Sequence, residues 1–169
     1  MNYFIFEISE TPFQKKDWIS LNSVLDENYS LPGADWVDDV ESPETRTDAI
    51  RNFFQNIFPD NSFKIIDNKI DKTAEIEFVG DLQNLLSQWK SQLLSFANAI
   101  TDDVNDGDVW RLKRCCERPF DIGSKFYFRD RTEWAAPVNE FFNDLKYIAA
   151  EHQSKPFRLY VGQVFKFHE

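Results

Sequence analysis

The sequence has few of the residues on which recognisable catalytic motifs depend. Its 169 residues include only 5 glycines, 2 cysteines and 2 histidines. It contains no Gly-x-Gly-x-x-Gly, phosphate-loop or Gly-x-Ser-x-Gly pattern. It also contains no His-x-x-x-His or Cys-x-x-Cys pair, and metal sites usually need three or four ligands at characteristic spacing. We therefore expect neither a metal nor a cofactor.

Disulfides and long apolar runs are also missing. The two cysteines are the neighbours Cys115 and Cys116, and a disulfide between adjacent residues is strained and rare, so we expect reduced thiols. No apolar run is long enough for a transmembrane span. Residues 1–7 lack a basic region and are interrupted by Glu7, unlike a signal peptide. Together these features predict a cytoplasmic protein.

Aromatic residues are abundant, with 17 Phe, 5 Trp and 5 Tyr. Each aromatic side chain buries a large area, and a domain of this length buries about 70% of the surface that its unfolded chain exposes. A core therefore needs no disulfide or metal to support it. Apolar residues are spread along the chain and no segment has the composition of a linker. We expect residues 1–169 to form one globular domain.

The periodicity of apolar residues predicts strands alternating with helices. We expect strands at residues 3–9, 63–67, 72–79, 109–117, 125–130 and 157–167. We expect helices at residues 14–25, from Pro43 to Pro59, over five turns after Gly80, and from Pro137 onward, with an irregular stretch at 26–41. This order predicts an α+β fold, with a mostly antiparallel sheet of five to six strands and about four helices mainly on one face.

The Asp-rich stretch at residues 102–108 invites comparison with a calcium loop. An EF-hand loop starting at Asp102 needs an oxygen ligand at its third position and Glu at its twelfth. Val104 and Lys113 occupy those positions. We therefore predict a solvated polar loop without calcium.

Charge is segregated along the chain, whose formal net charge is −10. Residues 26–48, the acidic segment, hold eight acids and one base, whereas residues 109–131, the basic segment, hold seven bases and three acids. The net negative charge argues against nucleic-acid binding as the main task and favours basic partners. The two segments either face each other across the fold, or are solvated faces, or include a docking surface.

The docking hypothesis concerns an aromatic residue among carboxylates in the acidic segment. Such a ring supplies contact area, and the acids steer a basic target. The alternative is that the tryptophan belongs to the core. The residues predicted to bind a partner are Asp35, Trp36, Asp38, Asp39 and Glu41.

These observations predict a non-enzymatic protein-interaction module, such as an acidic inhibitor or immunity-type protein that binds a basic protein. The alternative is an enzyme or small-ligand-binding protein with an aromatic-lined pocket, for which a deep pocket with a perturbed carboxylate would be the evidence. Two further readings have less support. In the first, Trp110 and residues 126–128, which lie among the Lys and Arg residues of the basic segment, would stack on nucleic-acid bases. The second is DNA mimicry, which requires carboxylates at phosphate-like spacing.

Overall fold

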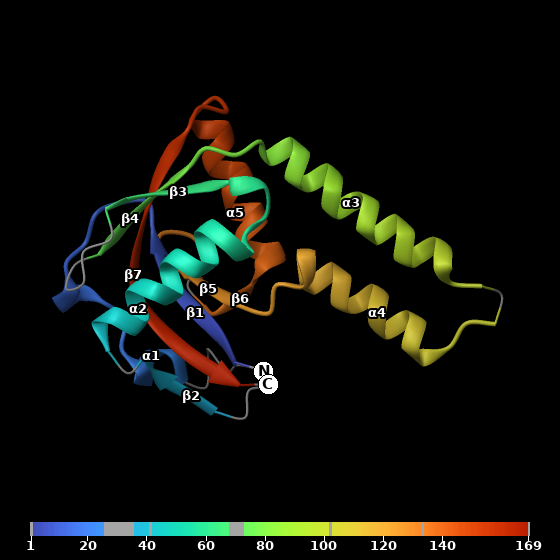
Figure 1. Ribbon diagram of the computed structural model, residues 1–169, viewed down its shortest axis with the longest axis horizontal. Helices are drawn as coiled ribbons and strands as arrows, with labels where there is room; N and C mark the ends of the chain where they lie inside the picture. Colours follow the sequence, from blue (N-terminus) through green and yellow to red (C-terminus); the bar gives the residue numbers. More distant parts are fainter. Residues whose placement is uncertain are drawn as a thin grey trace.

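A seven-stranded mixed sheet forms the centre of the computed structural model, which describes residues 2–25, 36–40, 42–67, 73–101, 103–132 and 134–168 (Figure 1). The sheet order is β3-β4-β7-β1-β5-β6, and β2 also pairs with β7. The β1–β5 pair is parallel, and the other five pairs are antiparallel. The strands are β1 (Asn2–Ser9), β2 (Trp36–Asp39), β3 (Phe63–Asp67), β4 (Ala74–Phe78), β5 (Lys125–Phe128), β6 (Ala136–Pro137) and β7 (Phe157–His168).

Five α-helices accompany the sheet in the described part of the chain. They are α1 (Leu21–Leu25), α2 (Pro43–Asn52), α3 (Leu82–Ala99), α4 (Asp106–Glu117) and α5 (Val138–Glu151). The α+β class predicted from the sequence is therefore confirmed, with a mixed sheet of seven strands and five helices in place of the five to six strands and four helices expected.

Capping side chains explain why α2 and α3 begin where the sequence predicts. The Ser42 hydroxyl oxygen accepts a hydrogen bond from the Thr45 backbone N–H at 3.2 Å, and proline occupies the first helical position. One carboxylate oxygen of Asp81 accepts from the backbone N–H groups of Gln83 and Asn84, at 2.9 and 3.1 Å. A π-helical segment, Phe53–Ile57, continues α2 toward Pro59.

The strand predicted over residues 109–117 is wrong, because these residues belong to helix α4. The Asn105 side chain caps this helix by accepting a hydrogen bond from the Asp108 N–H at 3.1 Å. Asp106 and Asp108 then lie in the first turn, where the helix dipole favours negative charge. The apolar residues Val109, Leu112 and Cys115 follow at helical spacing, which the strand prediction overlooked.

Two further expectations differ from the structure around the first loop. The helix expected over residues 14–25 is broken into a 3-10 turn, Lys15–Asp17, and the short α1. The irregular stretch at 26–41 contains β2, which forms because β7 offers a pairing edge that local sequence does not reveal. Part of that stretch, and the turn predicted at Asn68-Lys69, lie outside the described residues.

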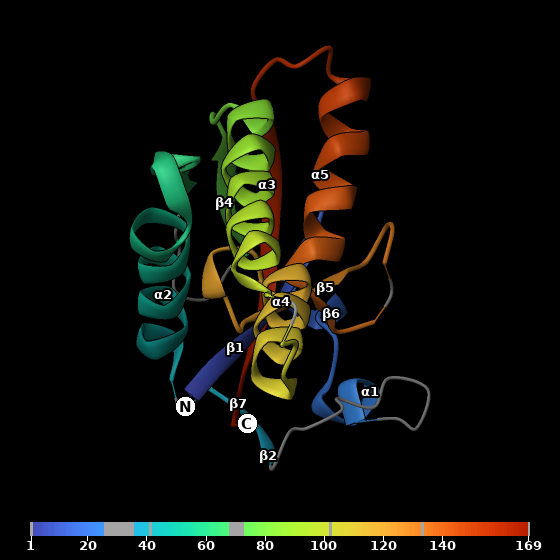
Figure 2. The same cartoon turned by 90° about the vertical axis from the view of Figure 1, so that its right-hand side faces the viewer.

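A cluster of phenylalanines joins α2 and α5 to the same face of the sheet. The Phe6 ring on β1 lies 4.8 Å from the Phe53 ring that follows α2, between centroids. The Phe126 ring on β5 stacks on Phe141 of α5 at 4.0 Å and 8°. Figure 2 looks along the arm and shows α2 and α5 on either side of α3, which projects toward the viewer. The opposite face of the sheet buries a smaller cluster of Ile5, Val24, Ala135, Phe165 and Phe167.

Helices α3 and α4 form an arm that extends away from the sheet (Figure 1). The apolar residues along α3 keep the helical period from Leu82 to Ile100. This pattern is typical of a helix that lies on a core along its length, but the structure shows such packing only at the base of α3. Leu82 and Leu85 are buried and Trp89 packs against the core, whereas every residue of α3 from Lys90 onward is exposed or half-buried. The outer part of the arm therefore contributes little to the core.

This difference predicts unequal effects of the same substitution in the core and in the arm. We expect Phe141→Ala to lower the free energy of unfolding by about 3–5 kcal/mol, because it empties a buried, stacked site. Phe96→Ala, at a residue that is 40% exposed on α3, should cost about 0.5 kcal/mol or less. Denaturant unfolding of both variants measures the difference, and equal losses would show that the arm belongs to the core.

Candidate binding surfaces and clefts

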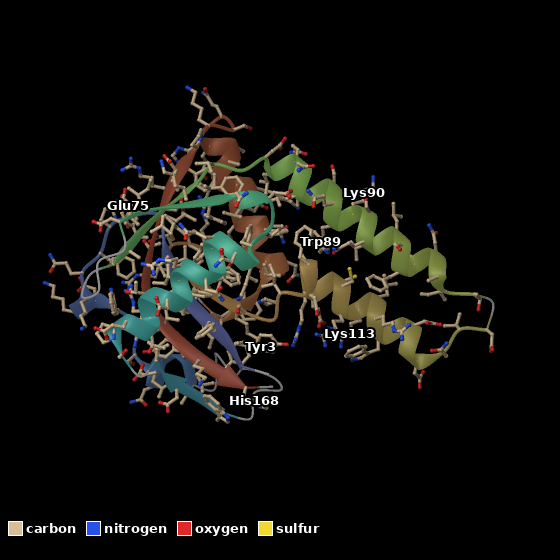
Figure 3. The ribbon with its side chains drawn as sticks, viewed as in Figure 1. Tyr3, Glu75, Trp89, Lys90, Lys113 and His168 are labelled. Carbon is tan, nitrogen blue, oxygen red and sulfur yellow. The ribbon has the colours of Figure 1, made fainter. Side chains whose placement is uncertain are left out.

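The predicted docking surface lies on strand β2, next to the end of β7 that His168 marks in Figure 3. The two strands run antiparallel, with Trp36 opposite His168 and Asp38 opposite Lys166. Because side chains alternate along a strand, Trp36 and Asp38 point to one side of the sheet, and Asp39 points to the other. The two carboxylates therefore do not surround the Trp36 ring evenly. The Asp38 carboxylate lies on the same side of the sheet as the ring, and the Asp39 carboxylate lies on the other side.

Neighbours on β7 hold the exposed Trp36 ring. Its centroid lies 6.2 Å from the His168 ring centroid, with the planes 13° apart, and the Lys166 ammonium nitrogen lies 5.7 Å from it. The residue is nevertheless 42% exposed. Trp36 is thus a surface side chain rather than a core residue, and its orientation is supported while much of its area stays in contact with solvent.

Both described carboxylates on β2 are exposed, and each accepts a hydrogen bond. An Asp39 carboxylate oxygen accepts from the Gln163 side-chain amide at 2.8 Å. An Asp38 carboxylate oxygen accepts from the Asp39 backbone N–H at 2.9 Å. These bonds orient the two acids, and the remaining oxygens are available to a partner.

Of the five residues predicted for this surface, the structure describes three, and all three are exposed on β2. The other two, Asp35 and Glu41, lie outside the described residues. Sequence reasoning missed the cation Lys166 and the ring of His168. Both are far away along the chain and join the surface only through strand pairing, for which the acidic segment holds no signal.

The basic segment forms ion pairs with acids that do not belong to the acidic segment. An Arg114 nitrogen lies 2.8 Å from Asp121, and an Arg131 nitrogen lies 2.6 Å from Glu10. These pairs join neighbouring parts of the fold. They partly neutralise the basic segment and leave the β2 carboxylates uninvolved.

A buried carboxylate, Glu7, lies where the pairing of β1 with β7 shifts in register. Its side chain has no exposed area, and it accepts hydrogen bonds from the Gln163 and Ile19 backbone N–H groups at 2.8 and 3.1 Å. A guanidinium nitrogen of Arg129 donates a third bond at 2.7 Å. Burial raises the pKa of the Glu7 carboxyl, because the loss of hydration outweighs these three hydrogen bonds.

Arg46 of α2 is buried on the same part of β7. Its guanidinium donates to the backbone carbonyls of Gly162 and Val161, both at 2.8 Å, and lies 4.4 Å from the centroid of the Trp18 ring. Burial lowers the pKa of Arg46 to about 10, and the negative charge of Glu7 opposes the change. Because both of these Arg46 bonds, and two of the three at Glu7, go to the backbone, we interpret this cluster as a structural clamp.

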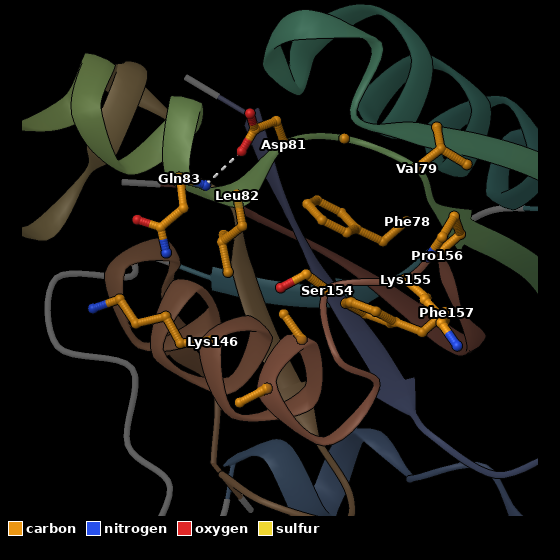
Figure 4. A pocket seen from close by; sticks show the side chains of 13 residues that line it. Phe78, Val79, Asp81, Leu82, Gln83, Lys146, Ser154, Lys155, Pro156 and Phe157 are labelled. Atoms are coloured by element: carbon orange, nitrogen blue, oxygen red, sulfur yellow. Dashed lines mark hydrogen bonds between the residues drawn. The ribbon is translucent and has the colours of Figure 1, made fainter.

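A cleft of about 430 Å³ lies between the beginning of α3 and the C-terminal end of α5 (Figure 4). Phe78, Leu82 and Phe157 contribute apolar surface to it, and Lys146 and Lys155 contribute positive charge. This is the kind of cleft that the small-ligand hypothesis requires. Its one carboxylate, Asp81, is the cap of α3.

Asp144 is another carboxyl group whose pKa is raised by burial. One of its oxygens accepts a hydrogen bond from the Thr132 hydroxyl at 2.9 Å. Neither Asp144 nor Glu7 lines the cleft between α3 and α5. The combination that would favour an enzyme, a pocket together with a perturbed carboxylate, is therefore not met at this cleft.

Comparison with protein-family models, with curated proteins and with solved structures finds no match to this chain. Within the described residues, no three or more His, Cys, Asp or Glu side chains are grouped so that they could hold a metal ion. No helix in those same ranges has both the length and the apolar character needed to cross a membrane. Cys115 and Cys116 are both free, the first buried and the second exposed.

The raised pKa of Glu7 predicts a particular dependence of stability on pH. The native state binds a proton at this carboxyl at higher pH than the unfolded chain does, so the Glu7 contribution to stability decreases as the pH rises above about 4.5. Glu7→Gln does not titrate at this position. We therefore expect the wild type to gain stability relative to Glu7→Gln when the pH is lowered from 7 to 5.

Denaturant unfolding of both proteins at the two pH values measures this difference. A shift in the opposite direction would show that Arg129 and the backbone N–H groups stabilise the ionised carboxylate more than burial penalises it. Glu44→Gln, which makes the same substitution at an exposed position, serves as the control for general effects of surface charge.

Proposed function

We propose that this protein is a non-enzymatic interaction module that binds a basic protein through the β2 surface, made up of Trp36, Asp38 and Asp39. The observation that carries the proposal is the exposed Trp36 ring, held in place by two β7 side chains next to exposed carboxylates. Exposed tryptophans with a polar rim are common centres of protein interfaces. A ring that is already oriented loses less entropy when it is buried by a partner.

The net charge of −10 supports a basic partner. Long-range attraction raises the rate of association between oppositely charged proteins and makes it sensitive to salt. Lys166, next to the Trp36 ring, gives the surface a positive point that a basic partner has to avoid or pair with an acid of its own. An acidic inhibitor that neutralises a basic enzyme is the form of interaction that this charge distribution fits best.

A small-ligand-binding protein is the second candidate, and the cleft between α3 and α5 is the observation that favours it. Its apolar wall and two lysines suit a small molecule that carries an apolar body and a negative group. Thermal unfolding with and without a panel of small carboxylates and phosphates would detect such a ligand, because a ligand that binds only the native state raises the Tm.

The interaction hypothesis predicts that a partner captured from lysate depends on β2. We expect Trp36→Ala to weaken the complex by about thirtyfold or more, because buried interface tryptophans contribute about 2 kcal/mol or more. Neutralising Asp38 and Asp39 together should reduce both the affinity and its dependence on salt. Capture at 0.05 and 0.5 M salt, followed by titration with the purified partner, measures both effects.

Matched controls separate the surface from general changes in charge and aromatic content. Trp134, beside β6, is 42% exposed, the same fraction as Trp36, and Trp134→Ala should leave binding unchanged. Asp103→Asn with Asp106→Asn removes the same charge at the outer end of the arm and should have little effect. Equal losses in the β2 variants and the controls would contradict the proposed surface.

A further inference from the structure

The outer part of the α3–α4 arm does not pack against the core. In α4, Cys115 near the base is the buried residue, and Trp89 of α3 donates its indole N–H to the Cys115 carbonyl at 2.8 Å. Figure 3 shows Trp89 at this base, between the arm and the rest of the protein. Trp89 also contacts Phe142 of α5 edge-on, with the ring centroids 5.9 Å apart. These contacts hold the arm at its base and leave its outer turns to solvent.

Apolar side chains are concentrated on those outer turns. Phe96 is 40% exposed, Leu94 and Val109 are about half exposed, and Trp110 is 57% exposed. Helices in proteins draw most of their stability from packing of an apolar face rather than from helix propensity. Of these four, Phe96 and Trp110 lie together along one groove, and exposed apolar side chains that lie together mark an interaction site more often than isolated ones do. The arm therefore presents a helical pair that lacks a third packing element.

The gap along this pair is a groove of about 610 Å³, here called the arm groove. Phe96, Trp110 and Phe120 supply its aromatic surface. The basic side chains of the arm groove are Arg111, Arg114 and Arg118, with Asp121 as its acid.

Two arginines of the arm groove are held in place by contacts with neighbouring side chains. Arg114 forms a 2.8 Å ion pair with Asp121, and its guanidinium lies 5.3 Å from the Trp110 ring centroid. The Arg118 guanidinium lies 5.5 Å from the Tyr3 ring. A second cleft, of about 330 Å³, shares these arginines and extends toward Tyr3 of β1 and toward Lys113, which Figure 3 shows on the lower side of the arm.

The charge of this region is opposite to that of the whole chain. Arg111, Lys113, Arg114 and Arg118 outnumber the acids of the two clefts, Glu117 and Asp121, on a protein whose net charge is −10. Four bases with two nearby acids offer few unopposed phosphate contacts, so the charge favours a protein partner over a nucleic acid. Apolar surface flanked by arginines complements a segment that carries apolar and acidic side chains.

We propose that the arm groove binds an acidic amphipathic helix of a partner protein. The apolar stripe of that helix lies against Phe96, Trp110 and Phe120. Its acids pair with Arg111. Laying an amphipathic helix into a groove between two helices is a recurring mode of peptide recognition. The bound helix completes a three-helix arrangement on the outer arm. This inference is independent of the β2 surface, which takes a partner of the opposite charge.

Selection from a random library of displayed 16-residue peptides on the immobilised full-length protein tests the proposal. We expect enrichment of peptides that combine Asp or Glu with large apolar residues spaced three or four apart. Synthetic copies of these peptides should bind Trp110→Ala and Arg111→Glu about tenfold or more weakly than they bind the wild type. Fluorescence anisotropy of labelled peptides measures the affinities, and circular dichroism checks that the variants are folded.

Two controls match these variants. Trp134→Ala removes a tryptophan outside the arm, and Lys90→Glu makes the same charge reversal as Arg111→Glu. Lys90 lies on the side of α3 opposite Gln92 and Phe96, because residues on a helix are about 100° apart. Binding to both controls should equal binding to the wild type.

Several results would overturn the proposal. One is no enrichment, or enrichment of peptides without acids. Another is equal binding by the arm variants and the controls. Binding of a labelled dT12 oligonucleotide that is lost in Arg111→Glu would assign the arm groove to nucleic acid instead. Self-association in sedimentation experiments that is lost in Trp110→Ala would assign it to a second copy of this chain.

Discussion

The pairing of β7 with three other strands constrains most of what this structure presents to a partner. β1 pairs with β7 along nearly the whole length of β1. β4 pairs with the first part of β7, and β2 pairs with the last part of β7. Trp36 reaches its exposed position because β2 aligns it with His168. The same strand carries Val161 and Gly162, whose carbonyls hold Arg46 of α2. One strand thus joins the proposed docking surface to the interior.

The buried clamp and the phenylalanine cluster are two different solutions to packing around this sheet. The phenylalanines fill space without polar cost, and their rings contact one another at centroid distances of 4.0 to 6.3 Å. Burial of Glu7 instead disfavours its ionised form and raises the pKa of the carboxyl. The hydrogen bonds that Glu7 accepts connect Ile19 and Arg129 to the sheet. The clamp is therefore suited to fixing loop positions at the register shift, where regular strand pairing is lost.

Sequence periodicity predicted those elements whose apolar residues face one core, such as β4 and α5. Periodicity wrongly predicted a strand where α4 lies, because most of this helix is exposed and its apolar stripe is short. It missed β2, which depends on a partner strand more than 120 residues away in sequence. The exposure of Trp36 and the arm groove also depend on which surfaces tertiary packing leaves uncovered. A single sequence carries the local pattern but not that outcome.

Site-specific photo-crosslinking tests whether Trp36 and Trp110 mark two separate interaction surfaces, while Trp134, which is as exposed as Trp36, marks none. A photoreactive amino acid would replace Trp36, Trp110 or Trp134 in the otherwise unchanged protein, expressed in its native cells. We expect a basic protein crosslinked from position 36, a different and acidic protein from position 110, and neither from position 134. Identical products from all three positions, or none from position 36, would contradict this expectation.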